Sequence, residues 1–370
     1  MPYVDAFNHF FPKRYFEKML EVAGGHKDIG KRVRGVPCLH DLEVRFAVMD
    51  QFAKHDYVQV LSLPSPPIEV MAEGATAIEM ARIGTDGMAE LVARHPDRFA
   101  GYVSSLPMSD PEAAAREAER AFTEAGANGI QLYSNVKGKP LDLPEFLPVF
   151  EMAARHDKPI LLHPIRGADM PDYKSEDRSK YEIWWTFGWP YETSAAMARI
   201  VFSGLLDRFP DLKVVTHHLG AMVPYFEGRV GPGWDQLGAR TSDEDLGAVL
   251  QRLKKRPLDY FKQFYADTAV FGSRSATVCG LEFFGPDRVL FASDSPFDPE
   301  GGPGYIRDTI KVLESLALDS ETRAKINHRN AERLFGLAPS YPRGGRRHGH
   351  RVSRRHALLM AEDDRSGGRR

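Results

Sequence analysis

Residues 212–229 read LKVVTHHLGAMVPYFEGR, and the first half of this stretch decides which fold the sequence predicts. Its apolar residues precede a pair of histidines, a pattern typical of a short buried strand in a parallel sheet. Gly220 lets the chain turn away after His217 and His218. In an α/β barrel such residues face the mouth of the barrel, where active sites lie. By themselves the two histidines are equally consistent with a purely structural role. In that case one would be buried and hydrogen-bonded, and the other would be exposed.

The alternation of strand and helix repeats on both sides of this stretch. Eight segments are expected to be strands: residues 3–7, 57–63, 98–103, 129–133, 159–163, 212–217, 264–267 and 289–293. Each is followed by a segment with helical spacing, such as residues 68–95, residues 192–207 and a helix that begins near Val223. Strands that alternate with helices imply a parallel sheet, and eight such units imply a closed (β/α)8 barrel. We therefore predict one α/β domain over residues 1–340.

Residues 341–370 differ in composition from the rest of the chain. From Pro342 onwards they contain nine arginines and three acidic residues, with many glycines and few apolar side chains. Such a composition predicts a disordered basic tail. Because the whole chain has a formal net charge of −2, the barrel itself carries an acidic excess, which argues against nucleic acid as its partner.

The overall composition is that of a soluble globular protein, with 42% hydrophobic and 27% charged residues. No apolar run reaches the ~18 residues that a membrane-spanning helix needs. The two cysteines, Cys38 and Cys279, do not make a disulfide framework and fit free thiols in a reducing compartment. We therefore expect a cytoplasmic protein without a membrane anchor.

Polar side chains gather at the carboxyl ends of the predicted strands. They are His9, Ser62, Ser65, Tyr133, Asn135, His163, His217, His218, Asp267 and Asp294. Among them His9, His163 and Asp294 follow three separate strands and are placed to converge on one metal, since imidazole and carboxylate both suit Zn²⁺ and Mn²⁺. Each of the three alone would be an ordinary hydrogen-bonding group, but their common position at one end of the barrel favours a metal site.

Several short motifs in a fixed order carry a family resemblance. They are Cys38–Arg45 (CLHDLEVR), Leu162–Pro164 (LHP), Gly188–Pro190 (GWP), His218–Arg229, Ser293–Phe297 (SDSPF) and Asn330–Phe335 (NAERLF). On these motifs the chain resembles the amidohydrolase-related decarboxylases, in particular the aminocarboxymuconate-semialdehyde and resorcylate-type decarboxylases. The match extends over about residues 5–337. It is specific for the superfamily and less so for the substrate.

The resemblance implies a metal held by His163 and Asp294 together with His9. It further implies that His218 is the catalytic histidine that activates water at the metal. The family opens with His-x-His or Glu-x-His, and both residues of that pair bind the metal. Here the first of the pair is Phe7, so only three protein ligands are expected, which is still enough for a catalytic zinc.

Three further residues take their expected roles from the resemblance. Arg45 is expected to bind the carboxylate of the substrate, a pairing that suits the guanidinium fork. Trp185 is expected to form an aromatic wall. Arg229 is expected to complete the site of a neighbouring subunit, which makes the protein a homodimer with shared active sites.

Together these roles predict a metal-dependent non-oxidative decarboxylase, a carboxy-lyase, of a small unsaturated or aromatic carboxylic acid. One divalent metal is expected, with Zn²⁺ preferred and Mn²⁺ as the alternative. His218 would transfer the proton, whereas His217 is expected to face away because adjacent strand residues point to opposite faces. Two other interpretations stay open. One is a metal-dependent hydrolase of a C–N, C–O or activated C–C bond, with Asp294 as base. The other is a barrel that binds a small acid without turnover.

Overall fold

Eight parallel strands form the central sheet of the computed structural model, which describes residues 1–23 and 30–339. They follow one another in chain order: β1 (Val4–His9), β2 (Val58–Ser62), β3 (Phe99–Ser105), β4 (Gly129–Tyr133), β7 (Ile160–His163), β8 (Val214–Thr216), β9 (Tyr265–Asp267) and β10 (Val289–Leu290). All eight predicted strands are confirmed, with bounds that differ by a few residues. A small antiparallel hairpin, β5 (Asn135–Val136) and β6 (Lys139–Pro140), follows β4.

The first and last strands meet through the segment that follows β10. Three backbone N–H groups donate across this seam: Ala6 to the carbonyl of Phe291 (2.9 Å), Asp294 to that of Phe7 (3.1 Å) and His9 to that of Ser295 (2.9 Å). These hydrogen bonds confirm the predicted (β/α)8 architecture. They also bring His9 and Asp294 side by side, although 285 positions separate them in the chain.

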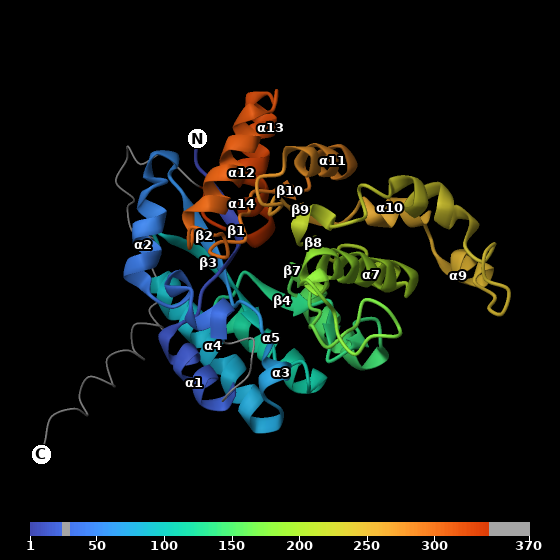
Figure 1. Cartoon of the computed structure of the whole chain (residues 1–370), viewed down its shortest axis with the longest axis horizontal. Helices are drawn as coiled ribbons and strands as arrows, with labels where there is room; N and C mark the ends of the chain where they lie inside the picture. Colours follow the sequence, from blue (N-terminus) through green and yellow to red (C-terminus); the bar gives the residue numbers. More distant parts are fainter. Residues whose placement is uncertain (24–29, 340–370) are drawn as a thin grey trace, which may run out of the picture. The chain divides into compact units, whose positions relative to one another are not determined.

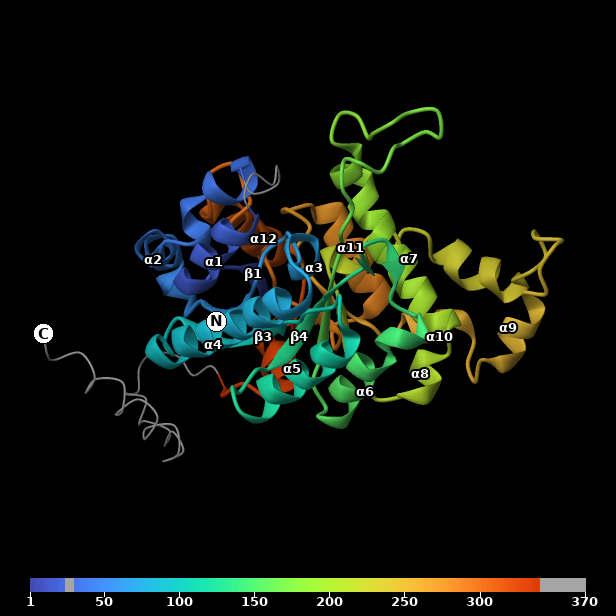
Figure 2. The same cartoon turned by 90° about the horizontal axis from the view of Figure 1, so that it is seen from below.

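Helices surround the strands (Figures 1 and 2). They are α1 (Lys13–Ala23), α2 (Leu42–Asp50), α3 (Ile68–Met71), α4 (Gly74–Arg94), α5 (Pro111–Thr123), α6 (Leu147–Arg155), α7 (Trp189–Phe202), α8 (Leu205–Arg208), α9 (Gly247–Arg252), α10 (Pro257–Phe261), α11 (Arg274–Phe284), α12 (Pro303–Ser315), α13 (Ser320–Ala324) and α14 (Asn330–Phe335). Several begin at a side chain that accepts a backbone hydrogen bond, as Asp110 does before α5 and Ser273 before α11. Such caps satisfy N–H groups that have no partner inside the helix.

Three predicted helices differ from what the structure contains. The helix expected over residues 68–95 is divided into α3 and α4, because the backbone of Ala72 and Glu73 is extended and Gly74 follows with a positive φ of 54°. Residues 192–207 are divided in the same way, at Gly204 (φ 77°). The helix expected near Val223 starts later and is irregular: turns cover residues 221–226, helical backbone begins at residue 227, and a π-helical turn (Arg229–Gly233) and a 3-10 turn (Trp234–Gln236) follow. The prolines and glycines of that segment account for this, since neither residue type favours a helix interior.

Apolar side chains from alternating strand positions fill the interior of the barrel. Val4, Val60, Val103 and Leu161 belong to this cluster, which also contains side chains of α14. A second and larger cluster packs the outer faces of the strands against the helices. The amino-terminal part of the barrel interior is thus a packed core, and the polar strand ends remain available for chemistry.

Other expectations concern the chain as a whole. Cys38 and Cys279 are both free thiols, as predicted. In the described part of the chain, none of the helices is both long and apolar enough to cross a membrane. The predicted disordered tail, residues 341–370, lies outside the described residues.

Candidate metal centre

Four buried side chains from four strand ends meet at the mouth of the barrel. His9 ends β1, His163 ends β7, His217 follows β8 and Asp294 lies in the segment after β10. Each offers one ligand atom, and these four atoms lie within 4.8 Å of one another. The three residues predicted from the sequence are therefore brought together, and His217 joins them.

The ring of His9 is oriented by a neighbouring hydroxyl. Ser62 donates its proton to the carbonyl of Asn8 (2.7 Å), so the same hydroxyl accepts from Nδ1 of His9 (3.1 Å). With the proton assigned to Nδ1, a lone pair on Nε2 faces Oδ1 of Asp294 at 3.0 Å. Two electron pairs this close need a cation or a proton between them.

The other two imidazoles of the cluster are held in the same way. Nδ1 of His163 donates to the carbonyl of Pro164 (2.6 Å), and Nδ1 of His217 donates to Oδ2 of Asp267 (2.5 Å). In each ring Nε2 is left as the ligand atom. Metal-binding histidines are generally fixed through their second nitrogen in this manner.

The ionisable groups of the cluster shift the pKa values of one another. Burial lowers the pKa of His163 well below its usual value, and the neighbouring His217 lowers it further. Burial also lowers the pKa of His217, but the carboxylates of Asp267 and Asp294 outweigh it and raise that pKa to about 9. Burial raises the pKa of Asp294, whereas the positive charge of His217 and bonds from the imidazoles hold it well below its ordinary range. A carboxylate and three inward nitrogens form a donor set that fits one divalent metal.

His218 lies beside the cluster but is bonded differently. Its Nε2 is 3.6 Å from Oδ2 of Asp294, and neither ring nitrogen has a hydrogen-bond partner among the described residues. We expected His217 and His218 to face opposite ways, and this is wrong. The strand ends at Thr216, and His218 and Leu219 both have positive φ (55° and 54°), so the chain folds back. The two imidazole rings lie 3.8 Å apart, both next to Asp294.

A narrow cavity of about 20 Å³ opens onto the cluster. Its walls are mainly aromatic, and its lining consists of Arg32, Ser65, His163, Trp185, Trp189, Phe271, Asp294, Phe297 and Tyr305. The guanidinium of Arg32 lies 4.9 Å from the ring centre of Trp189 and 5.7 Å from that of Phe297. Trp185 thus lies where a wall residue was predicted. The lining of the cavity thus combines aromatic rings with one guanidinium.

A family model described as amidohydrolase matches residues 4–337 of this chain. The chain belongs to the amidohydrolase family. Its family resemblance, inferred above from short motifs, is confirmed.

The relatives of this amidohydrolase are decarboxylases. The chain is 31% identical over 306 residues to the gamma-resorcylate decarboxylase of Rhodococcus jostii, covering 80% of this chain and 87% of the relative. It is 31% identical over 288 residues to the 2-amino-3-carboxymuconate-6-semialdehyde decarboxylase of Dictyostelium discoideum, covering 76% of this chain and 74% of the relative.

Solved structures that are similar to this chain also include decarboxylases. A 2,6-dihydroxybenzoate decarboxylase in complex with 2,6-dihydroxybenzoate is 26% identical with a TM-score of 0.72, covering 91% of this chain and 100% of the other. A dihydroxybenzoic acid decarboxylase from Polaromonas sp. JS666, with bound manganese and 2-nitroresorcinol, is 28% identical with a TM-score of 0.72, covering 90% and 97%.

Arg45 of this amidohydrolase lies elsewhere than the sequence suggested. Its side chain, on α2, is fully buried, and it donates to Oε1 of Gln59 (2.9 Å) and to Oδ1 of Asn8 (2.6 Å). It does not line the cavity beside the cluster. The arginine that does so is Arg32, which sequence analysis missed. The only signal was its place in a basic, glycine-bearing loop between the first strand and α2.

Arg229 is also remote from the cavity within a single chain. It is exposed and lines a separate groove with Met222, Phe226 and Trp234. Its predicted role across a subunit interface stays a prediction.

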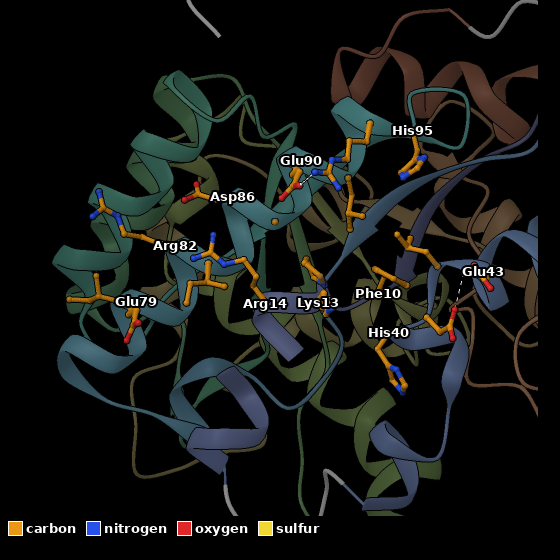
Figure 3. Close-up of a pocket in the computed structure, with 18 of the residues that line it drawn as sticks. Phe10, Lys13, Arg14, His40, Glu43, Glu79, Arg82, Asp86, Glu90 and His95 are labelled. Atoms are coloured by element: carbon orange, nitrogen blue, oxygen red, sulfur yellow. Dashed lines mark hydrogen bonds and ion pairs between the residues drawn. The ribbon is translucent and has the colours of Figure 1, made fainter. Parts of the chain in front are cut away.

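A groove much larger than this cavity lies apart from the metal cluster. It has a volume of about 1080 Å³ and runs between α1, α2 and α4, with Lys13, Arg14, Glu79 and Glu90 on its walls (Figure 3). No residue of the metal cluster is among the described residues that line it. Size alone therefore does not locate the site, whereas converging ligand atoms do.

Proposed function

We propose that this amidohydrolase is a metal-dependent non-oxidative decarboxylase of a small aromatic carboxylic acid. The observation that carries the proposal is that His163 and Asp294 of the metal cluster share one cavity with an arginine and aromatic walls, while His218 lies next to Asp294. Resorcylate-type decarboxylases recur among its relatives. The protein is an enzyme of this class, a carboxy-lyase.

The proposed metal ligands are His9, His163 and Asp294, which hold one divalent ion. A bound ion supplies a Lewis acid that orients a substrate oxygen and stabilises developing negative charge. Imidazole and carboxylate ligands suit Zn²⁺, which we expected from the sequence, while manganese is bound in the Polaromonas relative. Metal analysis of the purified protein decides between them.

Arg32 and the tryptophans provide the proposed substrate site. The guanidinium of Arg32 pairs with the substrate carboxylate, and Trp185 and Trp189 contact the faces of its ring. This proposal differs from the role expected for Arg45, which donates to Asn8 and Gln59. A ring-sized substrate requires these side chains to move apart, because the cavity has a volume of only about 20 Å³.

His218 is the proposed acid. It delivers a proton to the ring carbon that bears the carboxylate. The bond from that carbon to the carboxylate then breaks, its electron pair returns to the ring, and CO₂ leaves. No oxidant is needed. The absence of hydrogen-bond partners on His218 among the described residues leaves both nitrogens available for this transfer.

A homodimer in the cytoplasm is the proposed working state. Arg229 is exposed next to Tyr225 and Phe226, which are 79% and 38% exposed. Clustered exposed aromatic side chains are typical of interaction surfaces. The free thiols of Cys38 and Cys279 support a reducing compartment.

The test is direct detection of CO₂. Purified protein reconstituted with Zn²⁺ or Mn²⁺ is incubated with carboxyl-labelled 2,6-dihydroxybenzoate and related hydroxybenzoates and muconates. We expect labelled CO₂ and the decarboxylated product, and neither from chelator-treated protein. If the metal is bound but esters or amides are cleaved and no CO₂ forms, the protein is a hydrolase. Binding of these acids without any turnover would identify the third interpretation, a binding barrel.

A further inference from the structure

His217 has no part in the proposed chemistry, although its ring lies within the metal cluster. The side chain is fully buried. Its Nε2 lies 3.4 Å from Oδ1 of Asp294 and makes no hydrogen bond to any described residue. A buried polar atom without a hydrogen bond costs about 1–3 kcal/mol. Its position among three other inward ligand atoms indicates what would satisfy it.

The opposite edge of the ring is locked in place. Nδ1 of His217 donates to Oδ2 of Asp267 (2.5 Å). The second oxygen of that carboxylate accepts from the backbone N–H groups of His218 (3.1 Å) and Ala269 (2.9 Å). Asp267 is therefore fixed by two loops, and the imidazole that it holds presents Nε2 to the cluster. A carboxylate bonded to a metal-binding histidine typically sets ring orientation and raises ligand basicity.

Phe7 fixes the ring from the side of β1. Its ring is buried and meets the ring of His217 edge-on, with centres 4.2 Å apart and planes at 88°. At position 7 strand β1 offers an apolar edge and no donor atom. The neighbouring space is occupied by an imidazole that arrives from β8.

We propose that His217 is a fourth metal ligand of this chain, reaching from β8 into the position where Phe7 provides no donor. Asp267 is its positioning residue. The proposal rests on the metal centre of the proposed function. The completed set of three imidazoles and one carboxylate comes from the ends of β1, β7, β8 and β10.

Metal affinity tests this without reference to turnover. Metal-free protein is titrated with Co²⁺ alone, in competition with a chromophoric chelator, and the visible absorption of the bound ion is recorded. His217→Ala is expected to weaken Co²⁺ binding by at least ~100-fold and to change its spectrum. His218→Ala is the matched control, because that imidazole is adjacent and buried but is not among the four converging groups. It is expected to bind Co²⁺ with nearly wild-type affinity.

Two further variants separate a lost ligand from a damaged fold. Asp267→Asn keeps the volume of the carboxylate but weakens its hold on His217, and a loss of ~10–100-fold in affinity is expected. Phe7→His in the His217→Ala background places an imidazole in the neighbouring space, and partial recovery of Co²⁺ binding is expected. Thermal unfolding of every metal-free variant shows whether the barrel is intact.

X-ray absorption of the folded wild-type Zn²⁺ form gives an independent count of ligands. Three imidazoles are expected, and two would overturn the proposal. Unchanged Co²⁺ affinity in His217→Ala would also overturn it, while the proposed function would stand on His9, His163 and Asp294. A wild type that binds no stoichiometric Co²⁺, Zn²⁺ or Mn²⁺ would overturn both. His217 would then be a buried cation between Asp267 and Asp294.

Discussion

His218 differs from the three histidines of the cluster in how its ring is held. His9, His163 and His217 each have Nδ1 fixed by an acceptor, which suits a permanent ligand. His218 lacks a bonded partner on either nitrogen among the described residues, so a proton on its ring is not committed to the protein. At the scale of single residues, hydrogen bonding therefore separates ligands from the candidate acid.

The first prediction concerns His218. His218→Asn is expected to reduce kcat by ~10²–10⁴-fold, the usual loss when a general acid or base is removed. Metal content should stay at the wild-type level, because His218 is outside the four converging groups. Steady-state kinetics with elemental analysis checks both. Equal losses of turnover in His217→Asn and His218→Asn, with metal retained in both, would contradict the assignment.

The second prediction separates the two arginines. Arg32→Ala is expected to raise KM for a carboxylate substrate roughly 10- to 100-fold, since a charge-assisted hydrogen bond contributes ~1.5–3 kcal/mol. The effect on KM, more than that on the melting temperature, identifies its role. Arg45→Met should lower the melting temperature instead, because the buried oxygens of Asn8 and Gln59 lose their donor. The reverse pattern, with KM raised only in Arg45→Met, would restore the role that the sequence first suggested.

At the scale of elements, the turn that carries His218 depends on close packing against α11. A Cβ added at Gly280 of α11 would lie 2.2 Å from Cγ of Leu219, which is buried in that turn. Gly220 in the same turn has a positive φ of 75° and lies against Phe284 of α11. Small residues thus allow α11 to pack closely against the turn that carries His218.

Gly280→Ala provides the third prediction. In an ordinary helix this change stabilises by up to ~1 kcal/mol, but here we expect destabilisation of ~1–3 kcal/mol from overpacking. Turnover should fall as well, because the displaced turn moves His218. Gly247→Ala in α9 is the control, since an added Cβ there meets only Asp245 at 3.5 Å. A Gly280→Ala protein as stable and active as wild type would show that the turn is not set by α11.

Helix α3 contains a buried carboxyl group that gives the fourth prediction. Burial raises the pKa of Glu69 from 4.5 to about 7. The folded protein therefore binds a proton that the unfolded chain has released between about pH 4.5 and pH 7, so stability falls as the pH rises through this window. In Glu69→Gln, the decrease in the free energy of unfolding across this pH window should be smaller by about 3 kcal/mol.

Chemical denaturation at pH 4.5 and pH 8 measures this contribution. The variant Glu112→Gln, at a side chain that is 85% exposed, serves as the control and should keep the wild-type dependence. If Glu69→Gln and wild type lose equal stability between the two pH values, the carboxyl of Glu69 is ionised throughout and the prediction fails.

At the scale of the whole molecule, the remaining prediction is a shared active site. Arg229 lies eleven residues after His218 in the sequence, and within one chain it lines a different groove from the metal cluster. Mixing Arg229→Ala protein with His218→Asn protein should restore part of the activity, because some mixed dimers contain one intact site. Sedimentation analysis gives the oligomeric state. A fully active monomer, or no recovery after subunit exchange, would exclude sharing.

The barrel and part of its site follow from local sequence patterns. Strand composition, helical spacing and turn residues are properties of neighbouring residues, so they identified all eight strands without reference to distant contacts. Because the carboxyl ends of parallel strands meet at one rim, the same patterns placed His9, His163 and Asp294 together. The helix expected near Val223 starts late and is irregular, because the prolines and glycines of this segment disfavour a regular helix.

Tertiary structure alone decided which side chains face the cavity. Short-range periodicity in the sequence was enough to predict the number of strands and three of the four residues whose ligand atoms converge. It did not determine which way the side chain of His217 points. The backbone of His218 and Leu219 has positive φ, so the alternation of side chains along the strand stops at this point. Nor did the sequence point to Arg32, since two arginines, one in a π-helical turn and one on α2, are distinguished only by what packs around them.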